Sequence, residues 1–236
     1  MDVSDTYPDV KNNIPHCIGI IMDGNRRYAR ALGISTFSGH REGLRTLKKV
    51  SVWAFDAGVR TLIVYAFSTE NWQRPAKEVS YLMRLFVRAC TNELDELAER
   101  SIRIRFLGEK ERMPKNLLQQ ATRLEKETEN ALGQTLVIAF SYGSRAEIVN
   151  AMNVLMHSGK TSVTEGDIRM AMWSASLPDP DLIIRTGGEQ RLSNFLLFQM
   201  AYSELFFTKT MWPAFTKQEF EGILSWYALR EHRHGK

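Results

Sequence analysis

Short apolar runs alternate along this chain with longer stretches in which apolar residues recur at helical spacing. Runs that are apolar on successive residues are typical of strands buried on both faces, and strands that alternate with helices favour parallel pairing. We therefore predict an α/β fold with a mostly parallel central sheet of about six strands, flanked by helices on both sides. The predicted strands are Cys17–Met22, Thr61–Phe67, Ile102–Leu107, Thr135–Phe140, Leu182–Arg185 and, with a weaker pattern, Leu205–Phe207. The predicted helices are Arg41–Ala57, Ala76–Arg100, Pro114–Leu132, Arg145–His157, Thr164–Trp173 and Thr216–His232.

The composition is that of one globular domain. The chain has 236 residues, of which 44% are hydrophobic and 25% are charged. A chain of this size buries a full core without disulfides or metal ions. We expect residues 1–15 to form an N-terminal tail and residues 16–236 to form a single domain. Cys17 and Cys90 lie in apolar patterns and match no metal-ligand spacing, so we expect two buried thiols.

Net charge and hydropathy limit the classes of partner that this chain is expected to bind. The net charge of +4 suits an anionic partner without identifying one. No Lys/Arg block, basic stripe or stacking platform is visible, so we expect no nucleic acid partner. The N-terminal residues are polar and acidic, and no apolar run approaches the roughly 18 residues that a membrane helix needs. We expect a cytoplasmic protein that contacts a membrane only peripherally.

Polar residues collect where four of the predicted strands end. Glycine, arginine, hydroxyl and carboxylate side chains occur together in Asp23–Arg27, Ser68–Arg74, Ser141–Arg145 and Arg185–Asn194. In parallel sheets, ligands bind beyond these carboxyl ends. Arginines and close backbone amides bind phosphate, and carboxylates hold the Mg²⁺ that bridges to phosphate oxygens. The loops therefore predict one or two polyphosphate ligands with Mg²⁺.

Several alternative sites lack their motifs in this sequence. No G-x-x-x-x-G-K-[ST] occurs, which argues against a P-loop enzyme, and no G-x-G-x-x-G follows a predicted strand. No D-D-x-x-D occurs, which argues against helical trans-prenyltransferases and terpene cyclases. The histidines are scattered and form no metal-binding pair.

Motifs along nearly the whole chain resemble one family. They are His16–Asn25, Phe67–Pro75, Tyr142–Ile148, Pro178–Glu189, Arg191–Leu197 and Ala201–Phe206, followed by Trp212-Pro213. In this order and spacing, they resemble the cis-prenyltransferases, particularly bacterial undecaprenyl diphosphate synthases. The resemblance implies an apolar tunnel beside the sheet. It also implies the condensation of isopentenyl diphosphate with an allylic diphosphate, geranyl or farnesyl diphosphate, to a Z-polyprenyl diphosphate with release of pyrophosphate.

The resemblance also assigns roles to residues. It implies Mg²⁺ as cofactor, held by Asp23 with Glu204 as a second metal-associated carboxylate, and it implies catalytic roles for Asp23, Asn71 and His40. The substrate-binding positions that it implies are Gly24, Asn25, Arg26, Arg27, Tyr28, Ser68, Glu70, Trp72, Arg74, Arg185, Arg191 and Ser193. The terminal Arg233-His234-Gly235 resembles a segment that reaches a neighbouring subunit, which implies a homodimer.

Several positions depart from the family pattern. Arg26 replaces a glycine and Tyr28 replaces a tryptophan, while Thr36 stands where many members have an arginine that contacts the allylic diphosphate. We hypothesise that Arg26 compensates for the arginine absent at position 36. Phe140 is bulkier than the residue expected near the tunnel, so it either shortens the tunnel or simply packs in the core.

Other interpretations stay open at the level of sequence. Asp23 could cap the following helix, and Arg185 and Arg191 could form surface ion pairs with Asp179 and Asp181. The resemblance implies undecaprenyl-type lipid carrier synthesis. The alternatives are a short- or medium-chain Z-prenyl diphosphate synthase and a non-catalytic accessory subunit. The retained aspartate and arginines favour an active enzyme.

Overall fold

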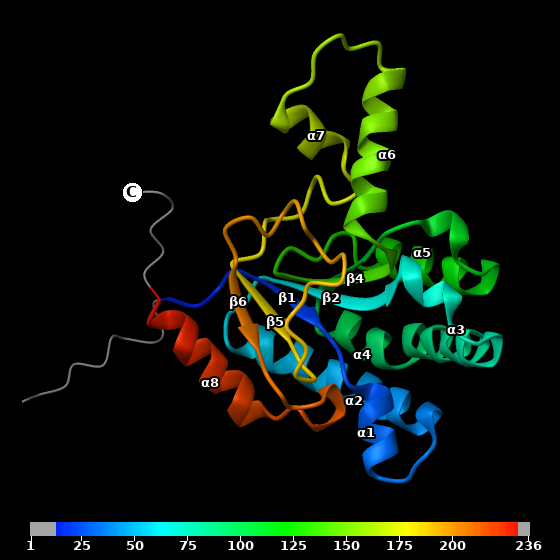
Figure 1. The fold of residues 1–236 in the computed structure, drawn as a ribbon, viewed down its shortest axis with the longest axis vertical. Helices are drawn as coiled ribbons and strands as arrows, with labels where there is room; N and C mark the ends of the chain where they lie inside the picture. Colours follow the sequence, from blue (N-terminus) through cyan, green and yellow to red (C-terminus); the bar gives the residue numbers. More distant parts are fainter. Residues whose placement is uncertain (1–12, 231–236) are drawn as a thin grey trace, which may run out of the picture.

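A six-stranded, fully parallel sheet forms the centre of the computed structural model, which describes residues 13–230 (Figure 1). The strand order is β3-β4-β2-β1-β5-β6, so β1 lies inside the sheet with β2 and β5 as its neighbours. The strands are β1 Cys17–Ile21, β2 Thr61–Ser68, β3 Ile102–Leu107, β4 Gln134–Tyr142, β5 Leu182–Arg185 and β6 Glu204–Phe207. The predicted α/β sheet is confirmed, including its weaker sixth strand.

Helices connect the strands. They are α1 Asn25–Ala31, α2 Thr36–Asp56, α3 Ala76–Thr91, α4 Glu93–Glu99, α5 Lys115–Glu127, α6 Ser144–His157, α7 Glu165–Ala171 and α8 Lys217–Ala228. Short 3₁₀ turns occupy η2 Thr69–Gln73, η3 Lys110–Arg112 and η4 Trp212–Ala214. None of the helices within residues 13–230 combines the length and apolar character needed to cross a membrane.

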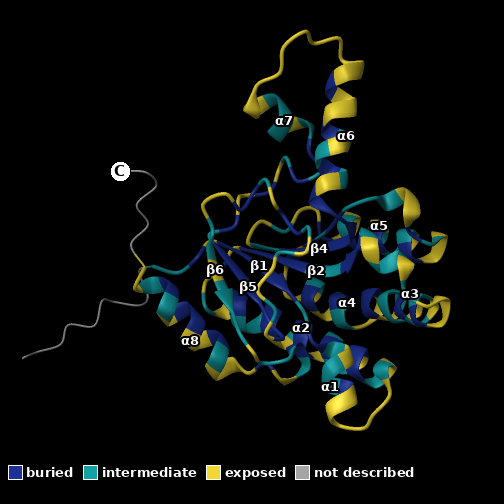
Figure 2. Ribbon diagram, viewed as in Figure 1, coloured by how far each residue is buried: buried dark blue, intermediate teal, exposed yellow. Residues whose placement is uncertain are grey.

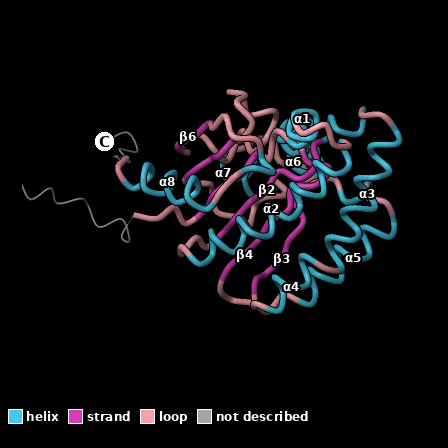
Figure 3. Tube along the Cα trace, turned by 90° about the horizontal axis from the view of Figure 1, so that it is seen from below, coloured by secondary structure: helices cyan, strands magenta, loops and turns pink. Residues whose placement is uncertain are grey.

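Side chains alternate between the two faces of the sheet, and the two faces are covered differently. On one face, Ile18 and Ile20 of β1 join the main core with side chains of α2, α3, α4, α5 and α8. On the other face, Cys17 and Ile21 pack in a smaller core with Phe195 and neighbouring side chains of two irregular segments, 172–181 and 186–203, which flank β5. Helices α3, α4 and α5 lie beside β3 and β4 in Figure 3, whereas α6 and α7 extend away from the sheet in Figures 1 and 2.

A buried carboxylate anchors the irregular cover of the second face. Glu147 of α6 is fully buried and accepts hydrogen bonds from the Tyr142 hydroxyl (2.6 Å), the Ser174 backbone N–H (2.8 Å) and the Gln199 amide (2.9 Å). A buried carboxylate is tolerated only where its oxygens are hydrogen-bonded, as they are here. This network ties the irregular segments 172–181 and 186–203 to β4 and α6.

Two helix predictions need correction. The predicted helix Ala76–Arg100 is divided between α3 and α4 at Asn92, whose φ of −133° and ψ of −80° are not helical. Neither Gly nor Pro marks the break, so the continuous apolar pattern concealed it. Residues 25–31, which we had included in a strand-end loop, form helix α1, and α2 begins at Thr36 rather than at Arg41 because Ser35 caps it (Ser38 N–H to Ser35 Oγ, 3.1 Å).

Gly108 lies where β3 leaves the sheet, and it provides a test of the packing there. Its φ is +132°, and a Cβ would stand 2.1 Å from the Phe140 carbonyl oxygen. Gly159 also has a positive φ, +74°, but a Cβ there would meet nothing within 4 Å. We expect Gly108→Ala to lower the free energy of unfolding by roughly 3 kcal/mol or more, and Gly159→Ala by about 1 kcal/mol, in urea titrations. Equal losses for the two variants would contradict the predicted clash with the Phe140 carbonyl.

Candidate functional site

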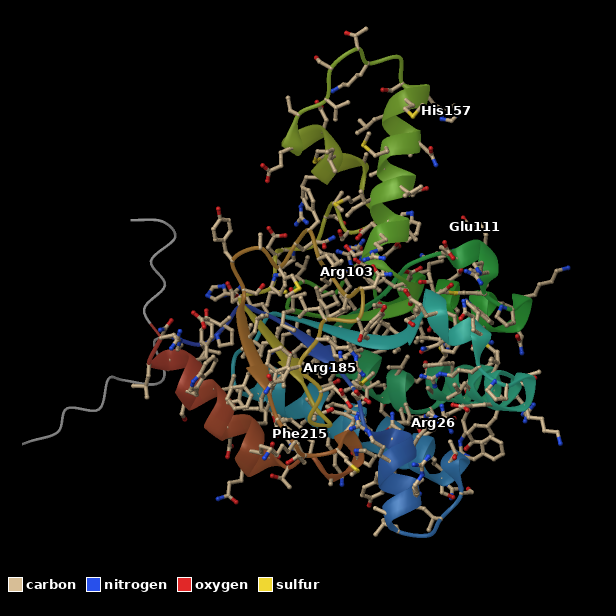
Figure 4. All side chains as sticks on the ribbon, in the orientation of Figure 1. Arg26, Arg103, Glu111, His157, Arg185 and Phe215 are labelled. Atoms are coloured by element: carbon tan, nitrogen blue, oxygen red, sulfur yellow. The ribbon has the colours of Figure 1, made fainter. Side chains whose placement is uncertain are left out.

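A polar cavity of about 570 Å³ opens at the carboxyl edge of the sheet. It lies where β1, β2 and β5 end side by side, since Ile21 pairs with both Tyr65 and Arg185. Figure 4 shows Arg26 of α1 and Arg185 of β5 on this side of the sheet. The cavity is lined by Ile21, Met22, Asp23, Gly24, Asn25, Arg26, Arg27, Arg30, His40, Tyr65, Ala66, Ser68, Asn71, Arg74, Leu82, Arg185, Arg191 and Ser193.

Asp23 is held between two arginines at the base of this cavity. One carboxylate oxygen accepts from Arg185 Nη2 at 2.9 Å, and the other lies 3.1 Å from Arg27 Nη2. Its backbone N–H donates to Thr186 Oγ1 (3.0 Å). The cap of α1 is Gly24, at a φ of 114°, without a side-chain hydrogen bond, so Asp23 does not act as the helix cap. Its carboxylate is instead directed to the arginines.

The ionisation of Asp23 follows from these contacts. Burial on its own would raise the pKa of this carboxyl group. The hydrogen bonds from Arg185 and Arg27, together with the positive charges of these two arginines, outweigh burial and hold the pKa below its ordinary value. Asp23 is therefore a carboxylate at neutral pH.

Arg185 is only 4% exposed and is fixed from two sides. Besides contacting Asp23, it donates to the Ser193 hydroxyl (2.8 Å) and to the Arg191 carbonyl. Ser193 has a φ of +50°, so the backbone after Arg191 turns back toward the strand end. Arg191 pairs with Glu189 (2.5 Å), and Asp179 pairs with Arg169. The alternative pairing of Arg185 and Arg191 with Asp179 and Asp181 is wrong.

A second carboxylate, which the sequence did not single out, organises the opposite wall. Glu78 of α3 is buried, and its Oε1 lies 3.1 Å from Arg74 Nη1, 3.3 Å from His40 Nε2 and 4.0 Å from Arg26 Nε. Desolvation lowers the pKa of His40, assisted by the charge of Arg74, while Glu78 opposes the shift. The only sequence signal was a carboxylate four residues after Arg74 on a predicted helix, which is a common surface pattern.

The 3₁₀ turn η2 contributes some of its predicted residues to the cavity but not all. Ser68 and Asn71 line it, and Asn71 Oδ1 accepts from the Ser68 backbone N–H (3.2 Å). Trp72 does not line the cavity: its indole N–H donates to Ser141 Oγ (2.9 Å), and its ring packs edge-on against Phe67. Glu70 accepts from the Asn194 amide (2.9 Å) beside the cavity. In this conformation, Trp72 and Glu70 support the wall from outside.

Tyr28 and Glu204 also lie apart from the cavity lining. Glu204 begins β6 opposite Leu182, the first residue of β5, whereas Asp23 is the second residue after Ile21, the last of β1. The two carboxylates thus lie at opposite ends of the parallel strands, Asp23 at the carboxyl end and Glu204 at the amino end. Glu204 pairs with Arg230 (3.2 Å). Glu204 was expected as a second metal-associated carboxylate; it does not lie beside Asp23 within one chain, and its role at a metal stays a prediction. The segment Arg233–Gly235 lies outside the described residues.

An apolar cavity of about 70 Å³ continues from the polar one between α2 and α3. Its lining is dominated by apolar side chains such as Leu47, Leu85 and Phe86. The two cavities adjoin, because they share five lining residues: Met22, Asn25, His40, Ala66 and Leu82. Phe140 does not line the apolar cavity: it is fully buried, stacked on Phe67 (5.2 Å) and edge-on to Phe86 (4.9 Å).

The arrangement suits a polyanion with an apolar tail. Six arginines line the polar cavity around one carboxylate, Asp23, and such a cluster matches phosphate oxygens. Within residues 13–230, no three His, Cys, Asp or Glu side chains come together as a metal-ligand set. Asp23 alone nevertheless fits a divalent ion that is bound through one carboxylate and the substrate's phosphates.

Comparison with known proteins agrees with this geometry. Residues 21–235 match the family described as "Putative undecaprenyl diphosphate synthase". The isoprenyl transferase of Fusobacterium nucleatum is 47% identical over 96% of this chain and 98% of its own length. That of Thermotoga maritima is 43% identical over 94% of this chain and 97% of its own length.

Solved structures give the same result. Lavandulyl diphosphate synthase from Lavandula x intermedia, solved with dimethylallyl diphosphate, superposes with a TM-score of 0.91 at 28% identity, covering 97% of this chain and 100% of its own. A probable undecaprenyl diphosphate synthase from Campylobacter jejuni superposes with a TM-score of 0.81 at 29% identity. The match covers 95% of this chain and 100% of that one.

The contact between Glu78 and His40 predicts a shift in titration. Glu78 raises the pKa of His40 against the lowering effects of burial and of Arg74. We expect Glu78→Gln to lower the His40 pKa further, as measured by NMR titration of the imidazole ring. Glu42→Gln, which removes an exposed carboxylate paired with Arg45 on the same helix, should leave it unchanged. A His40 pKa that rises in Glu78→Gln would contradict the assigned contact.

Proposed function

The chain belongs to the undecaprenyl diphosphate synthase family and is a cis-prenyltransferase, and we propose that its two adjoining cavities hold the two parts of its substrates. The diphosphates of isopentenyl diphosphate and of an allylic diphosphate bind in the polar cavity. The growing prenyl chain extends into the apolar one. The observation that carries this proposal is the shared wall, which places the arginines directly beside an apolar channel.

The residues divide between the two diphosphates according to their position. The allylic diphosphate is bound by residues after the end of β1 and at the start of α1, which are Asp23, Gly24, Asn25, Arg26 and Arg27. Arg185, Arg191 and Ser193, after β5, receive isopentenyl diphosphate. His40 lies at the junction of the cavities, where the allylic carbon would react.

The condensation requires that negative charge on the departing diphosphate be stabilised and that water be excluded from the reacting carbon. Negative charge develops on the departing diphosphate as the allylic C–O bond breaks, and preorganised guanidinium groups stabilise it. The isopentenyl double bond then forms the new C–C bond and a proton is lost. Apolar side chains around the reacting carbon exclude the water that would otherwise trap the cation. Arg74, Asn71 and Ser68 close the cavity on the η2 side.

Enzymes of this family generally need a divalent metal, and we propose Mg²⁺ on Asp23. An oxygen ligand and substrate phosphates are the set that Mg²⁺ commonly uses. When bound, the ion would neutralise diphosphate charge as a Lewis acid. Glu204 stands too far along the sheet to share that ion within one chain, so a role for it would lie elsewhere.

Further features of the protein remain proposals. Exposed apolar side chains on α6 and α7, among them Val149, Met156 and Met170, support a homodimer formed through these helices. All six strands belong to one sheet, which supports a single domain over residues 16–236. The cytoplasmic location stays a prediction, as does the absence of a nucleic acid partner.

Product length is the open part of the function. The undecaprenyl-type lipid carrier is the length that the family name suggests, and a short- or medium-chain product is the alternative. Phe140 does not block the apolar cavity directly, but it supports Phe86, which does line it. We propose that Phe140 influences product length only through the position of Phe86.

The activity is tested with purified protein, Mg²⁺, labelled isopentenyl diphosphate and either geranyl or farnesyl diphosphate. We expect a Z-prenyl diphosphate whose length is read by chromatography. Asp23→Asn should lower kcat by a factor of about 1000, since the carboxylate at the base of the cavity is lost. Equal rates for this variant and the wild type would refute the assignment of Asp23, and no product with any primer would favour the accessory-subunit alternative.

Arg26 offers a separate test. It lines the polar cavity with its side chain 55% exposed, whereas Thr36 does not line it. Arg26→Gly should raise the KM for the allylic substrate roughly tenfold, corresponding to one charge-assisted contact of about 1.4 kcal/mol, with a smaller effect on isopentenyl diphosphate. Arg103→Ala, on the exposed side of edge strand β3, is the control and should change neither constant. An unchanged allylic KM in Arg26→Gly would sink the compensation hypothesis.

A further inference from the structure

The turn between α1 and α2 projects from the body of the protein and exposes apolar side chains. Figure 1 shows this turn at the end of the molecule opposite α6 and α7, and Figure 2 shows that it is exposed. Leu32 is 57% exposed, Ile34 40% and Phe37 39%, although they lie within six residues of one another. A cluster of exposed apolar side chains on a projecting turn has no role in the protein's own core.

The segment that carries this tip is strongly basic. Residues 24–55 contain seven Lys and Arg side chains and one acidic side chain, Glu42, a net charge of +6 in a chain whose total is +4. Glu42 is itself paired with Arg45 (2.6 Å). Arg30 and Arg41, on either side of the tip, are exposed, and no acidic side chain of residues 13–230 forms an ion pair with either. Arg26, Arg27 and Lys48 are paired with acidic side chains from outside this segment. The unpaired positive charge beside the apolar tip therefore comes from Arg30 and Arg41.

The tip is joined to the entrance of the active site. Phe37 stacks on Tyr81 of α3 with ring centroids 4.3 Å apart, and the Tyr81 hydroxyl donates to the Phe37 carbonyl (3.0 Å). The next residue, Leu82, lines both the polar and the apolar cavity. Arg30, in the last turn of α1, lines the polar cavity as well. The tip is thus in contact with α3 and, through Arg30 and Leu82, adjoins the residues that line the polar cavity.

We propose that the α1–α2 tip, formed by Leu32, Ile34 and Phe37, docks on a lipid bilayer that carries anionic headgroups. Apolar side chains flanked by arginines insert at the boundary of headgroups and acyl chains, and the arginines attract the anionic surface. This inference rests on the proposed function, because a prenyl diphosphate is itself an amphiphile with an anionic head and an apolar tail. Docking at the cavity entrance would let the tail pass into lipid without crossing water.

The docking is tested with vesicles of phosphatidylcholine alone and of phosphatidylcholine mixed with phosphatidylglycerol. The wild-type protein should co-sediment with the anionic vesicles and be released by high salt. The double variant Leu32→Ser/Ile34→Ser should bind them at least tenfold more weakly. Its matched control is Leu132→Ser/Leu229→Ser, which removes two other exposed leucines (99% and 64% exposed) and should bind like the wild type.

A second readout separates this inference from the proposed function. In the absence of vesicles, Leu32→Ser/Ile34→Ser should perform a single condensation at the wild-type rate, because neither residue lines a cavity. Adding anionic vesicles should speed steady-state turnover of the wild type and of the control, but not of this variant.

Equal vesicle binding by the wild type and the tip variant would overturn the proposed docking surface. A wild type that binds no vesicle would also overturn it, and would favour a protein as the partner of the tip. Absence of condensation without vesicles would instead refute the proposed function.

Discussion

Strand β1 pairs in parallel with β2 on one side and β5 on the other, so three strands end together at one edge of the sheet. Every polar group of the cavity depends on this pairing. It brings Asp23 within 2.9 Å of Arg185, although 162 positions separate them in the chain. Without that register, the arginine-containing loops that follow these strands would not meet.

The pairing also explains how a nearly buried arginine is tolerated. A buried charge is costly unless a partner and hydrogen bonds compensate for desolvation. Arg185 has Asp23 on one side and Ser193 on the other, and Glu78 plays the corresponding role for Arg74 and His40. Each carboxylate fixes at least one arginine in place, and the cavity wall stays rich in positive charge. The resulting site is preorganised for an anion before any substrate arrives.

The contrast between the two cavities decides what kind of anion the site suits. A purely polar cavity would accept inorganic phosphate or a nucleotide. Here, the polar wall adjoins an apolar channel between α2 and α3, and His40 and Leu82 belong to both. The same two helices lead outward to the projecting α1–α2 turn, where Phe37 rests on Tyr81. Helices α2 and α3 thus contribute to the polar cavity, to the apolar channel and to the support of the exposed apolar tip.

The sequence by itself determined the strands and the loops that follow them, because apolar runs and loop motifs are local patterns. It therefore placed Asp23 and Ser193 correctly in loops that follow strands and Arg185 at the end of β5, whereas Arg27 proved to lie on helix α1. Only the tertiary structure decided which side chains meet, because strand register and side-chain direction depend on contacts between distant segments. Register placed Glu204 at the opposite end of the strands from Asp23, and packing directed Trp72 away from the cavity, onto Ser141. The role of Glu78 was hidden for the same reason: its partners come from α1, α2 and the end of η2, and no local pattern records that they converge.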